Sequence, residues 1–292
     1  SQEFDFSGKQ VTILIGFGPG GTYGQYSQLI AEHLGKHLPG KPNVIVESRP
    51  GAGGMTMANY AAQALPADGY NYIMPADTSV LVQLMQPKKV KYDIGKFTWI
   101  GSANQTNIIV VMRSDTGVKT WEDLTKAEQP MASTGLGSVA YIGPKLMNGL
   151  LDTKMKVVSG YKSSGKAGLS IEQGETRGAG FNWLFWKSKY ESWFEGDEPF
   201  ARAVMQIGYE RDPEVPDSVP MLSDVVDEKD KPLVDFVGAL GLIGRGLAAP
   251  PGTPEPAIEA MRAAWEELME DPEFRADADK RKLRVIPTSG AK

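Results

Sequence analysis

The first fifty residues constrain the fold of this chain more than any other stretch. The β-branched run Gln10–Ile15 predicts a strand buried on both faces, as in a parallel sheet. A glycine-rich loop follows, and a second strand is expected at Asn43–Glu47. Between them, apolar residues recur at helical spacing, at Tyr26, Ile30, Leu34 and Leu38. Strand, helix and strand in this order form a right-handed βαβ unit, so the sequence predicts an α/β fold.

Length and composition narrow the classes of protein that this opening can belong to. The chain has 292 residues, which favours two domains over one. Its net charge of −5 argues against nucleic acid and anionic membranes as main partners. Cysteine is absent, which excludes disulfides, thiolate metal ligands and cysteine nucleophiles. No apolar run is long enough to predict a transmembrane helix.

The first glycine-rich loop carries two alternative interpretations. Gly16, Gly18 and Gly21 match G-x-G-x-x-G, and Glu47 ends the second strand, so an NAD-dependent oxidoreductase is one hypothesis. The helix is expected to begin after Gly21, however, whereas the third glycine of that motif belongs inside the helix. Under either interpretation, a strand that turns into a helix presents backbone N–H groups and a positive dipole end. Such a site suits a carboxylate as well as a phosphate, and the remaining alternative is a tight turn that binds nothing.

A second loop of the same kind is expected in the middle of the chain, between a strand at Met131-Ala132 and a helix. Its hydroxyls and glycines suit a ligand, and the alternative interpretation is a helix cap with ordinary turn glycines. Its last residue is a good helix N-cap; these residues are Ser133, Thr134, Gly135, Gly137 and Ser138. Further along, Asn182 and Trp183 belong to an aromatic-rich run that follows a strand. That run either packs in the core or forms a pocket wall.

The two histidines offer little support for metal or hydrolytic chemistry. His33 and His37 are four residues apart on the first helix, a spacing that can hold a metal ion, but no third ligand is evident. A solvated or packed pair is the expected arrangement. No G-x-S-x-G motif accompanies them, so acyl transfer is not expected.

Several separated motifs together resemble the substrate-binding proteins of tripartite tricarboxylate transporters. They are Phe17-Gly18-Pro19-Gly20-Gly21, Val46-Glu47-Ser48-Arg49-Pro50-Gly51-Ala52-Gly53-Gly54, Ala67-Asp68-Gly69-Tyr70, Phe97-Thr98-Trp99-Ile100-Gly101, Trp121-Glu122-Asp123-Leu124, Gly174-Glu175 and Leu247-Ala248-Ala249-Pro250-Pro251-Gly252-Thr253-Pro254. The resemblance covers essentially the whole chain. It implies a periplasmic-binding-protein fold of type II, with two lobes, mostly parallel sheets and a ligand cleft.

The same resemblance implies a function and a set of binding residues. The function is that of a periplasmic receptor without catalysis, cofactor or metal, whose lobes close on a small carboxylate and deliver it to transporter membrane subunits. The start at Ser1 is compatible with removal of a secretory signal. The ligand-binding residues are expected in both glycine-rich loops and after the later strand, at Phe17, Pro19, Gly20, Gly21, Thr22, Tyr23, Ser133, Thr134, Gly135, Gly137, Ser138, Asn182 and Trp183.

The expected lobes are residues 1–102 with 226–292, and residues 103–225. The return to the first lobe is placed near the acidic, proline-bearing stretch 209–235.

Two positions beside the first loop depart from the family pattern. Gly24 stands where relatives commonly carry an acidic residue, and Gln28 where many carry a basic one. Di- and tricarboxylates and aromatic acids all remain open as ligands. Because neither loop contains Asp or Glu, an acid without an amino group is expected, unless Glu175 reaches the cleft.

Overall fold

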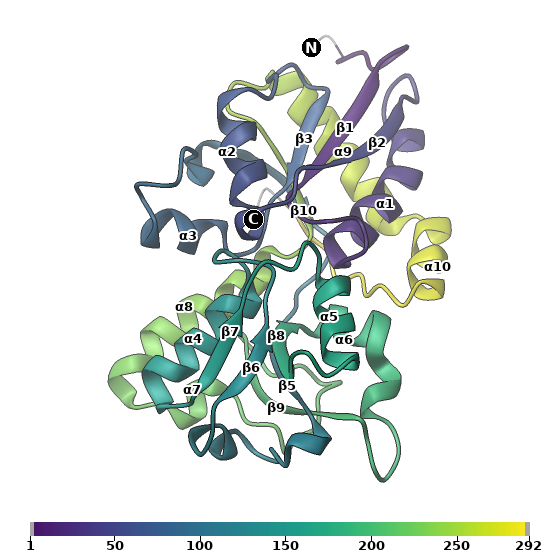
Figure 1. Ribbon diagram of the computed structural model, residues 1–292. Coiled ribbons are helices and arrows are strands. Elements are labelled where there is room, and N and C mark those ends of the chain that lie inside the picture. The colour runs from purple at the N-terminus through teal and green to yellow at the C-terminus, as the bar shows by residue number, and fades with distance from the viewer. Residues whose placement is uncertain (1–2, 290–292) are drawn as a thin grey trace. The chain divides into compact units, whose positions relative to one another are not determined.

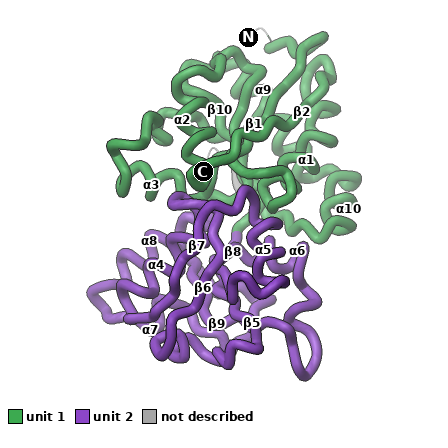
Figure 2. Tube along the Cα trace, in the orientation of Figure 1, with its two compact units in different colours: residues 1–105, 243–292 green, residues 106–242 purple. Residues whose placement is uncertain are grey.

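The computed structural model describes residues 3–289, and the chain divides into two α/β units (Figure 1). Unit 1 comprises residues 1–105 and 243–292, and unit 2 comprises residues 106–242 (Figure 2). Ser1 and Gln2, on which the interpretation of the N-terminus rests, lie outside the described residues. The predicted α/β fold class is confirmed, because each unit has a sheet of its own.

Unit 1 is built on a six-stranded sheet in the order β11-β4-β10-β3-β1-β2. Its strands are β1 (Gln10–Ile15), β2 (Asn43–Ser48), β3 (Asn71–Met74), β4 (Thr98–Ser102), β10 (Gly246–Ala249) and β11 (Thr288–Ser289). Its helices are α1 (Thr22–Leu34), α2 (Met55–Gln63), α3 (Ser79–Met85), α9 (Glu255–Glu270) and α10 (Pro272–Lys280), with short 3₁₀ turns that include η1 (Gly35–His37). The apolar face predicted for α1 is buried, as are five of the six residues of β1.

Unit 2 is built on a five-stranded sheet in the order β7-β6-β8-β5-β9. Its strands are β5 (Ile108–Arg113), β6 (Gln129–Ala132), β7 (Met155–Val158), β8 (Gly178–Asn182) and β9 (Ala201–Ile207). Its helices are α4 (Val139–Leu151), α5 (Ser164–Glu172), α6 (Trp183–Tyr190), α7 (Leu222–Val225) and α8 (Lys231–Ala239). The aromatic run packs against β5, and the Trp186 indole donates a hydrogen bond of 3.0 Å to the Ile109 carbonyl.

Both sheets are mixed, which corrects the expectation of mostly parallel sheets. The βαβ connections do give parallel neighbours: β1 pairs with β2 and β3, and β6 pairs with β7 and β8. The antiparallel pairs involve three strands: β10 pairs with β3 and β4, β11 pairs with β4, and β5 pairs with β8 and β9. β5 and β10 each enter their sheet from the other unit and not through a helix that packs on the same sheet, so nothing requires them to be parallel.

The return to unit 1 lies at residue 243 in this division, rather than at the expected residue 226. Residues 226–242 pack within unit 2, where an added Cβ at Gly238 of α8 would lie 2.7 Å from the backbone of Gly208. Val215 and Val219 are also buried in the core of unit 2. The stretch 209–235 therefore contributes to a core and is not only a surface crossing.

Candidate functional site

The predicted loop of unit 1 leaves the end of β1 and leads into the first turn of α1. Gly21 is the N-cap of α1, and its lack of a side chain leaves the first-turn N–H groups without side-chain capping. The first turn contains no acidic residue. A 13-residue helix that begins in this way presents a positive dipole end and backbone donors, as an anion site requires. As expected, α1 begins at Thr22, so Gly21 lies outside the helix.

Close backbone contacts hold this loop in shape. A Cβ at Gly16 would lie 2.7 Å from the Cα atom of Gly54, which belongs to the loop after β2. A Cβ at Gly24 would lie 2.1 Å from the carbonyl oxygen of Pro19. The hydroxyl of Ser48, at the end of β2, donates a hydrogen bond of 2.6 Å to the Phe17 carbonyl. Gly24 is therefore the residue that lets the loop fold back onto the first turn of α1.

Two aromatic residues of this loop pack against each other. The rings of Phe17 and Tyr23 are stacked, with centroids 4.7 Å apart, and both side chains are buried. The Tyr23 hydroxyl accepts a hydrogen bond of 3.0 Å from the backbone N–H of Asp77. Burial raises the pKa of Tyr23 above its usual range, and the Asp77 carboxylate adds to the rise, so the hydroxyl stays neutral. Pro19 and Gly20 are the exposed residues of the loop.

Sequence reasoning missed two charged residues that lie next to this loop. Arg245, directly before β10, is only 3% exposed, and its Nη2 donates a hydrogen bond of 2.7 Å to Thr22 Oγ1. Its guanidinium lies over the Tyr23 ring, 4.2 Å from the centroid. Asp77 is 4% exposed, and its Oδ2 lies 3.7 Å from Arg245 Nη1. The only sequence signal for Arg245 is a lone charge between Gly244 and Gly246 at the start of an apolar strand.

The topology of the sheet explains why these residues meet. Ile15 at the end of β1 pairs with Ser48 at the end of β2 and with Met74 at the end of β3, so the following loops leave the same edge. β10 is antiparallel to β3, so its first residues lie at this edge too. Ligands of α/β proteins bind at such carboxyl ends of parallel strands.

In unit 2, the predicted loop follows β6 and leads into α4. Ser138 is the N-cap of α4, as expected, but its hydroxyl bonds to Ser133 Oγ at 3.1 Å rather than to the helix. The first turn of α4 contains no acidic residue. Ser133, Thr134, Gly135, Gly137 and Ser138 are all buried. This helix end has the same design as that of α1: a glycine-rich approach, no side-chain cap and no negative charge.

Asn182 is the last residue of β8, and Trp183 follows it. Because β8 pairs in parallel with β6, both predicted segments of unit 2 lie at one edge of its sheet. Asn182 is the N-cap of α6. Trp183 is 7% exposed and packs in the core, as the first of its two interpretations predicts. Its indole N–H has no acceptor among residues 3–289, which leaves a donor for the second interpretation. Glu175 is exposed and precedes β8, at the opposite end of that strand from Asn182.

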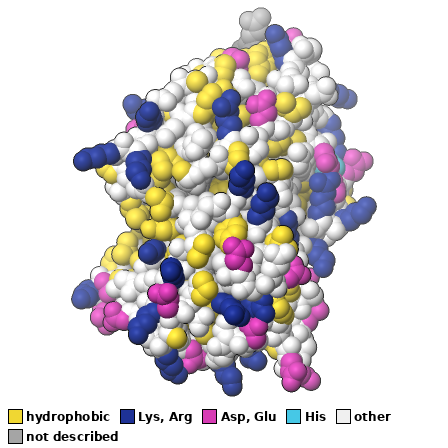
Figure 3. Space-filling view, viewed as in Figure 1, with side chains coloured by type: hydrophobic (Ala, Val, Ile, Leu, Met, Phe, Trp, Pro, Cys, Tyr) yellow, Lys and Arg dark blue, Asp and Glu magenta, His cyan; other side chains and the backbone are white. Residues whose placement is uncertain are grey.

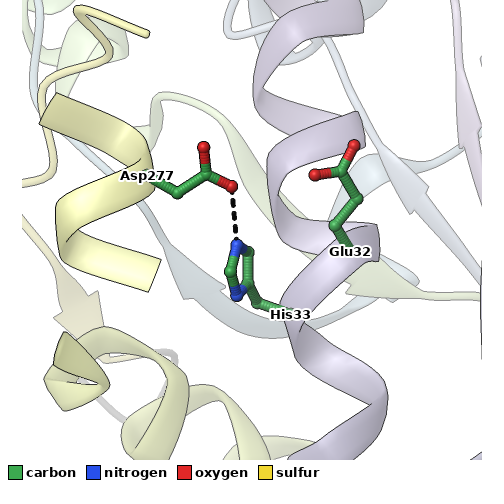
Figure 4. A group of neighbouring side chains, drawn as sticks. All are labelled: Glu32, His33 and Asp277. Carbon is green, nitrogen blue, oxygen red and sulfur yellow. Dashed lines mark hydrogen bonds and ion pairs between the residues drawn. The ribbon is translucent and has the colours of Figure 1, made fainter. Parts of the chain in front are cut away.

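The two histidines lie in an ion-pair network between helices of unit 1. His33 on α1 and Asp277 on α10 form a hydrogen bond of 2.7 Å, with Glu32 next to His33 on α1 (Figure 4). The possible ligand atoms of these three residues lie within 4.8 Å of one another. The guanidinium of Arg281 pairs with both Glu32 and Asp277, so a side-chain cation already neutralises these carboxylates. His37 similarly contacts Asp271 and Glu267.

Two α/β units, each with an uncapped helix start at the carboxyl edge of its parallel strands, have the architecture of the periplasmic-binding-protein class. Helix starts of this kind favour negatively charged groups. Acidic and basic side chains are interspersed over the face of the molecule that Figure 3 shows. Among the described residues, no helix is long and apolar enough to cross a membrane.

Comparison with known proteins gives the family. Residues 27–289 match the tripartite tricarboxylate transporter family receptor, so the chain belongs to this family of periplasmic solute-binding receptors. A UPF0065 protein of Agrobacterium vitis, encoded in the TAR-I ttuE-ttuC' intergenic region, is 29% identical over 163 residues, which are 54% of this chain. The chain spans about half the length of such curated relatives, 46% in this case.

Two solved structures of Rhodopseudomonas palustris proteins share the fold. MatC with bound malate has a TM-score of 0.71 and 23% identity, covering 94% of this chain and 90% of MatC. Rpa4515 with adipate has a TM-score of 0.71 and 20% identity, covering 98% of this chain and 92% of that protein.

Proposed function

We propose that this protein is a receptor that captures a small carboxylate and delivers it to the membrane subunits of a tripartite tricarboxylate-type transporter. The observation that carries the proposal is the repeated design of the two helix starts, at Gly21 of α1 and Ser138 of α4. Each offers backbone donors and no acidic residue, which complements an anion and not a cation. The bound malate and adipate of the two structural neighbours support the same class of ligand.

Each unit would contribute one loop to the ligand. In unit 1 the donors are the amides of residues 22–24 and the Thr22 hydroxyl. In unit 2 they are the amide and hydroxyl of Thr134 and the amides at the start of α4, because the amides of Ser133, Gly135 and Ser138 already donate within the unit. Water completes such shells at little cost in free energy. Tyr23 and the Trp183 indole would contact the body of the ligand, which suits an extended or an aromatic acid.

Binding without turnover fits the site better than the oxidoreductase alternative. Gly21 lies at the N-cap and not within the helix, and Glu47 is exposed at the end of β2. The glycine that permits close backbone approach inside α1 is Gly24, and its neighbour is the Pro19 carbonyl of the loop rather than a strand. The dinucleotide motif requires close packing of helix on strand at its third glycine.

Thermal unfolding with a ligand panel tests the proposal. The panel contains malate, adipate, citrate and benzoate on one side, and NAD⁺ and NADH on the other. At 100 times its Kd, a ligand stabilises the folded protein by about 2.7 kcal/mol, a rise in melting temperature of several degrees. We expect at least one acid to give this rise. A rise in melting temperature with the nucleotides alone would contradict the receptor function and support the oxidoreductase hypothesis.

The charges at the site predict a second property of the ligand. Asp77 is the acidic residue next to the unit 1 loop, and it faces Arg245. An ammonium group would therefore find no uncompensated carboxylate there, and an unpaired desolvated charge costs several kcal/mol. We expect malate to bind more tightly than aspartate, its α-amino analogue, in paired calorimetric titrations. Tighter binding of aspartate would mean that a negative group reaches the ligand from elsewhere.

A further inference from the structure

Arg245 is the most deeply buried cation next to the first loop, and its hydrogen bonding is incomplete. Its Nη2 donates to Thr22 Oγ1, but Nε and Nη1 have no hydrogen-bond acceptor among residues 3–289. The nearest carboxylate oxygen, on Asp77, lies 3.7 Å from Nη1, beyond hydrogen-bond distance. A buried guanidinium is normally fully hydrogen-bonded, because desolvating its N–H groups is costly. The two N–H-bearing atoms without an acceptor therefore call for an explanation beyond packing.

Thr22 connects Arg245 to the start of α1. It is the first residue of the helix, and its hydroxyl oxygen accepts from the guanidinium. A hydroxyl that accepts one bond from a cation still has its own proton to donate. Charge-assisted hydrogen bonds polarise the next bond in a chain, so this donor is strengthened. Thr22 thus adds an O–H donor to the first-turn amides, at the end of the helix where the dipole is positive.

We infer that Arg245 determines the charge of the group that the unit 1 loop accepts: it selects an ionised carboxylate over a neutral amide of the same shape. This inference rests on the proposed function, and it assigns the selectivity to a residue outside both glycine-rich loops. Arg245 acts through its hydrogen bond to Thr22, and Asp77 lies 3.7 Å from its Nη1. It is a positioning residue and does not itself contact the ligand.

The test compares acids with their amides in wild type and variants. The probe is the acid that binds most tightly among malate, adipate, citrate and benzoate, together with its own amide (the monoamide for a polyacid), measured by calorimetry. The main variant is Asp77→Asn/Arg245→Gln, which removes both charges together and so leaves neither partner buried alone. Thr22→Val removes the connecting hydroxyl. Arg262→Gln is the control, because Arg262 is a cation of the same unit that bonds to the Trp99 carbonyl, away from the loops.

In wild type and in Arg262→Gln, we expect the acid to bind at least about tenfold more tightly than the amide, the difference between charge-assisted and neutral hydrogen bonds. In Asp77→Asn/Arg245→Gln and in Thr22→Val, this ratio should fall several-fold. Arg245→Lys, which keeps the charge, should retain part of it. A purely structural role would weaken acid and amide equally and leave the ratio unchanged.

The outcomes separate this inference from the proposed function. If wild type binds an acid and the double variant keeps the acid-to-amide ratio of wild type, the inference is wrong and the receptor function stands. If no acid binds to wild type, the proposed function fails and the inference fails with it. Thermal unfolding of each variant without ligand identifies any that do not fold, and Thr22→Val then decides the result.

Discussion

Gly24 is the residue on which the shape of the first loop most depends. Substitution by alanine would place a Cβ 2.1 Å from the Pro19 carbonyl oxygen, so the loop must shift. We expect Gly24→Ala to destabilise the protein by about 1–3 kcal/mol, as overpacking does, and to weaken carboxylate binding. Urea unfolding and calorimetry measure the two effects.

Gly149 provides the matched control for this prediction. It is exposed on α4, and an added Cβ there would meet no heavy atom within 4 Å. Gly149→Ala should therefore stabilise the protein by about 0.5–1 kcal/mol through helix propensity, without effect on binding. Equal free energies of unfolding for the two variants would show that the first loop accommodates a side chain at position 24.

For single residues, the sequence predicts local features such as helix starts, but it does not predict that Arg245 lies next to the first loop. The start of α1 after Gly21 and the N-cap position of Ser138 follow from glycine and serine chemistry within a few residues. Arg245 could not be placed in this way, because it bonds to Thr22, 223 positions away. The sequence shows that position 24 carries no acid, but the close contact with Pro19 that explains the glycine depends on the folded loop.

Among the elements, α10 is joined to α1 by ion pairs that depend on pH. The hydrogen bond with His33 lowers the pKa of Asp277, and Arg281 lowers it further. A carboxyl whose pKa is lower in the folded state stabilises the fold above its unfolded pKa, about 3.9, and this contribution is lost as the pH falls through the folded value. Asp277→Asn should therefore be less stable than wild type at pH 7, and the difference should shrink below about pH 4.

Urea unfolding at several pH values between 7 and 3 measures this difference. Asp123→Asn is a useful comparison, because hydrogen bonding to Lys126 and to backbone N–H groups also lowers the pKa of Asp123. These partners of Asp123 are all close to it in sequence, whereas Asp277 is paired with another helix. A difference between Asp277→Asn and wild type that stays constant down to pH 3 would mean that the ionised carboxylate does not contribute.

The parallel elements could be predicted from the sequence, and the antiparallel ones could not. Strand, loop and helix signals identify β1, α1 and β2, because each βαβ connection is local and has one handedness. The position of β10 between β3 and β4 depends on a strand that returns from another unit, for which no local pattern exists. Similarly, α8 carries no signal that assigns it to unit 2 rather than to unit 1.

For the whole molecule, the two units differ in whether one continuous segment of the chain contains a complete sheet. Only such a segment is expected to fold when it is separated from the rest. All five strands of the unit 2 sheet lie within residues 106–242, whereas residues 1–105 lack β10, a central strand of the unit 1 sheet. We expect an excised 106–242 fragment to give a dispersed amide NMR spectrum and cooperative unfolding. The fragment 1–105 should show neither. A cooperatively folded 1–105 fragment would show that β3 and β4 do not need β10 between them.

The pairing of Ile73 with Ala248, which joins residues separated by more than half of the chain, also affects the order in which the sheet of unit 1 forms. Contacts between residues far apart in sequence form slowly, because loop-closure entropy opposes them until the intervening chain has become compact. Unit 2, which lies between the two segments of unit 1, can fold early. Its compaction brings residues 1–105 and 243–292 within reach of each other. The sheet of unit 1 is therefore completed only when β10, in the last quarter of the chain, pairs with β3. Residues 71–74 are left with an unpaired strand edge until that quarter arrives, and this interval is when aggregation or chaperone capture competes with folding.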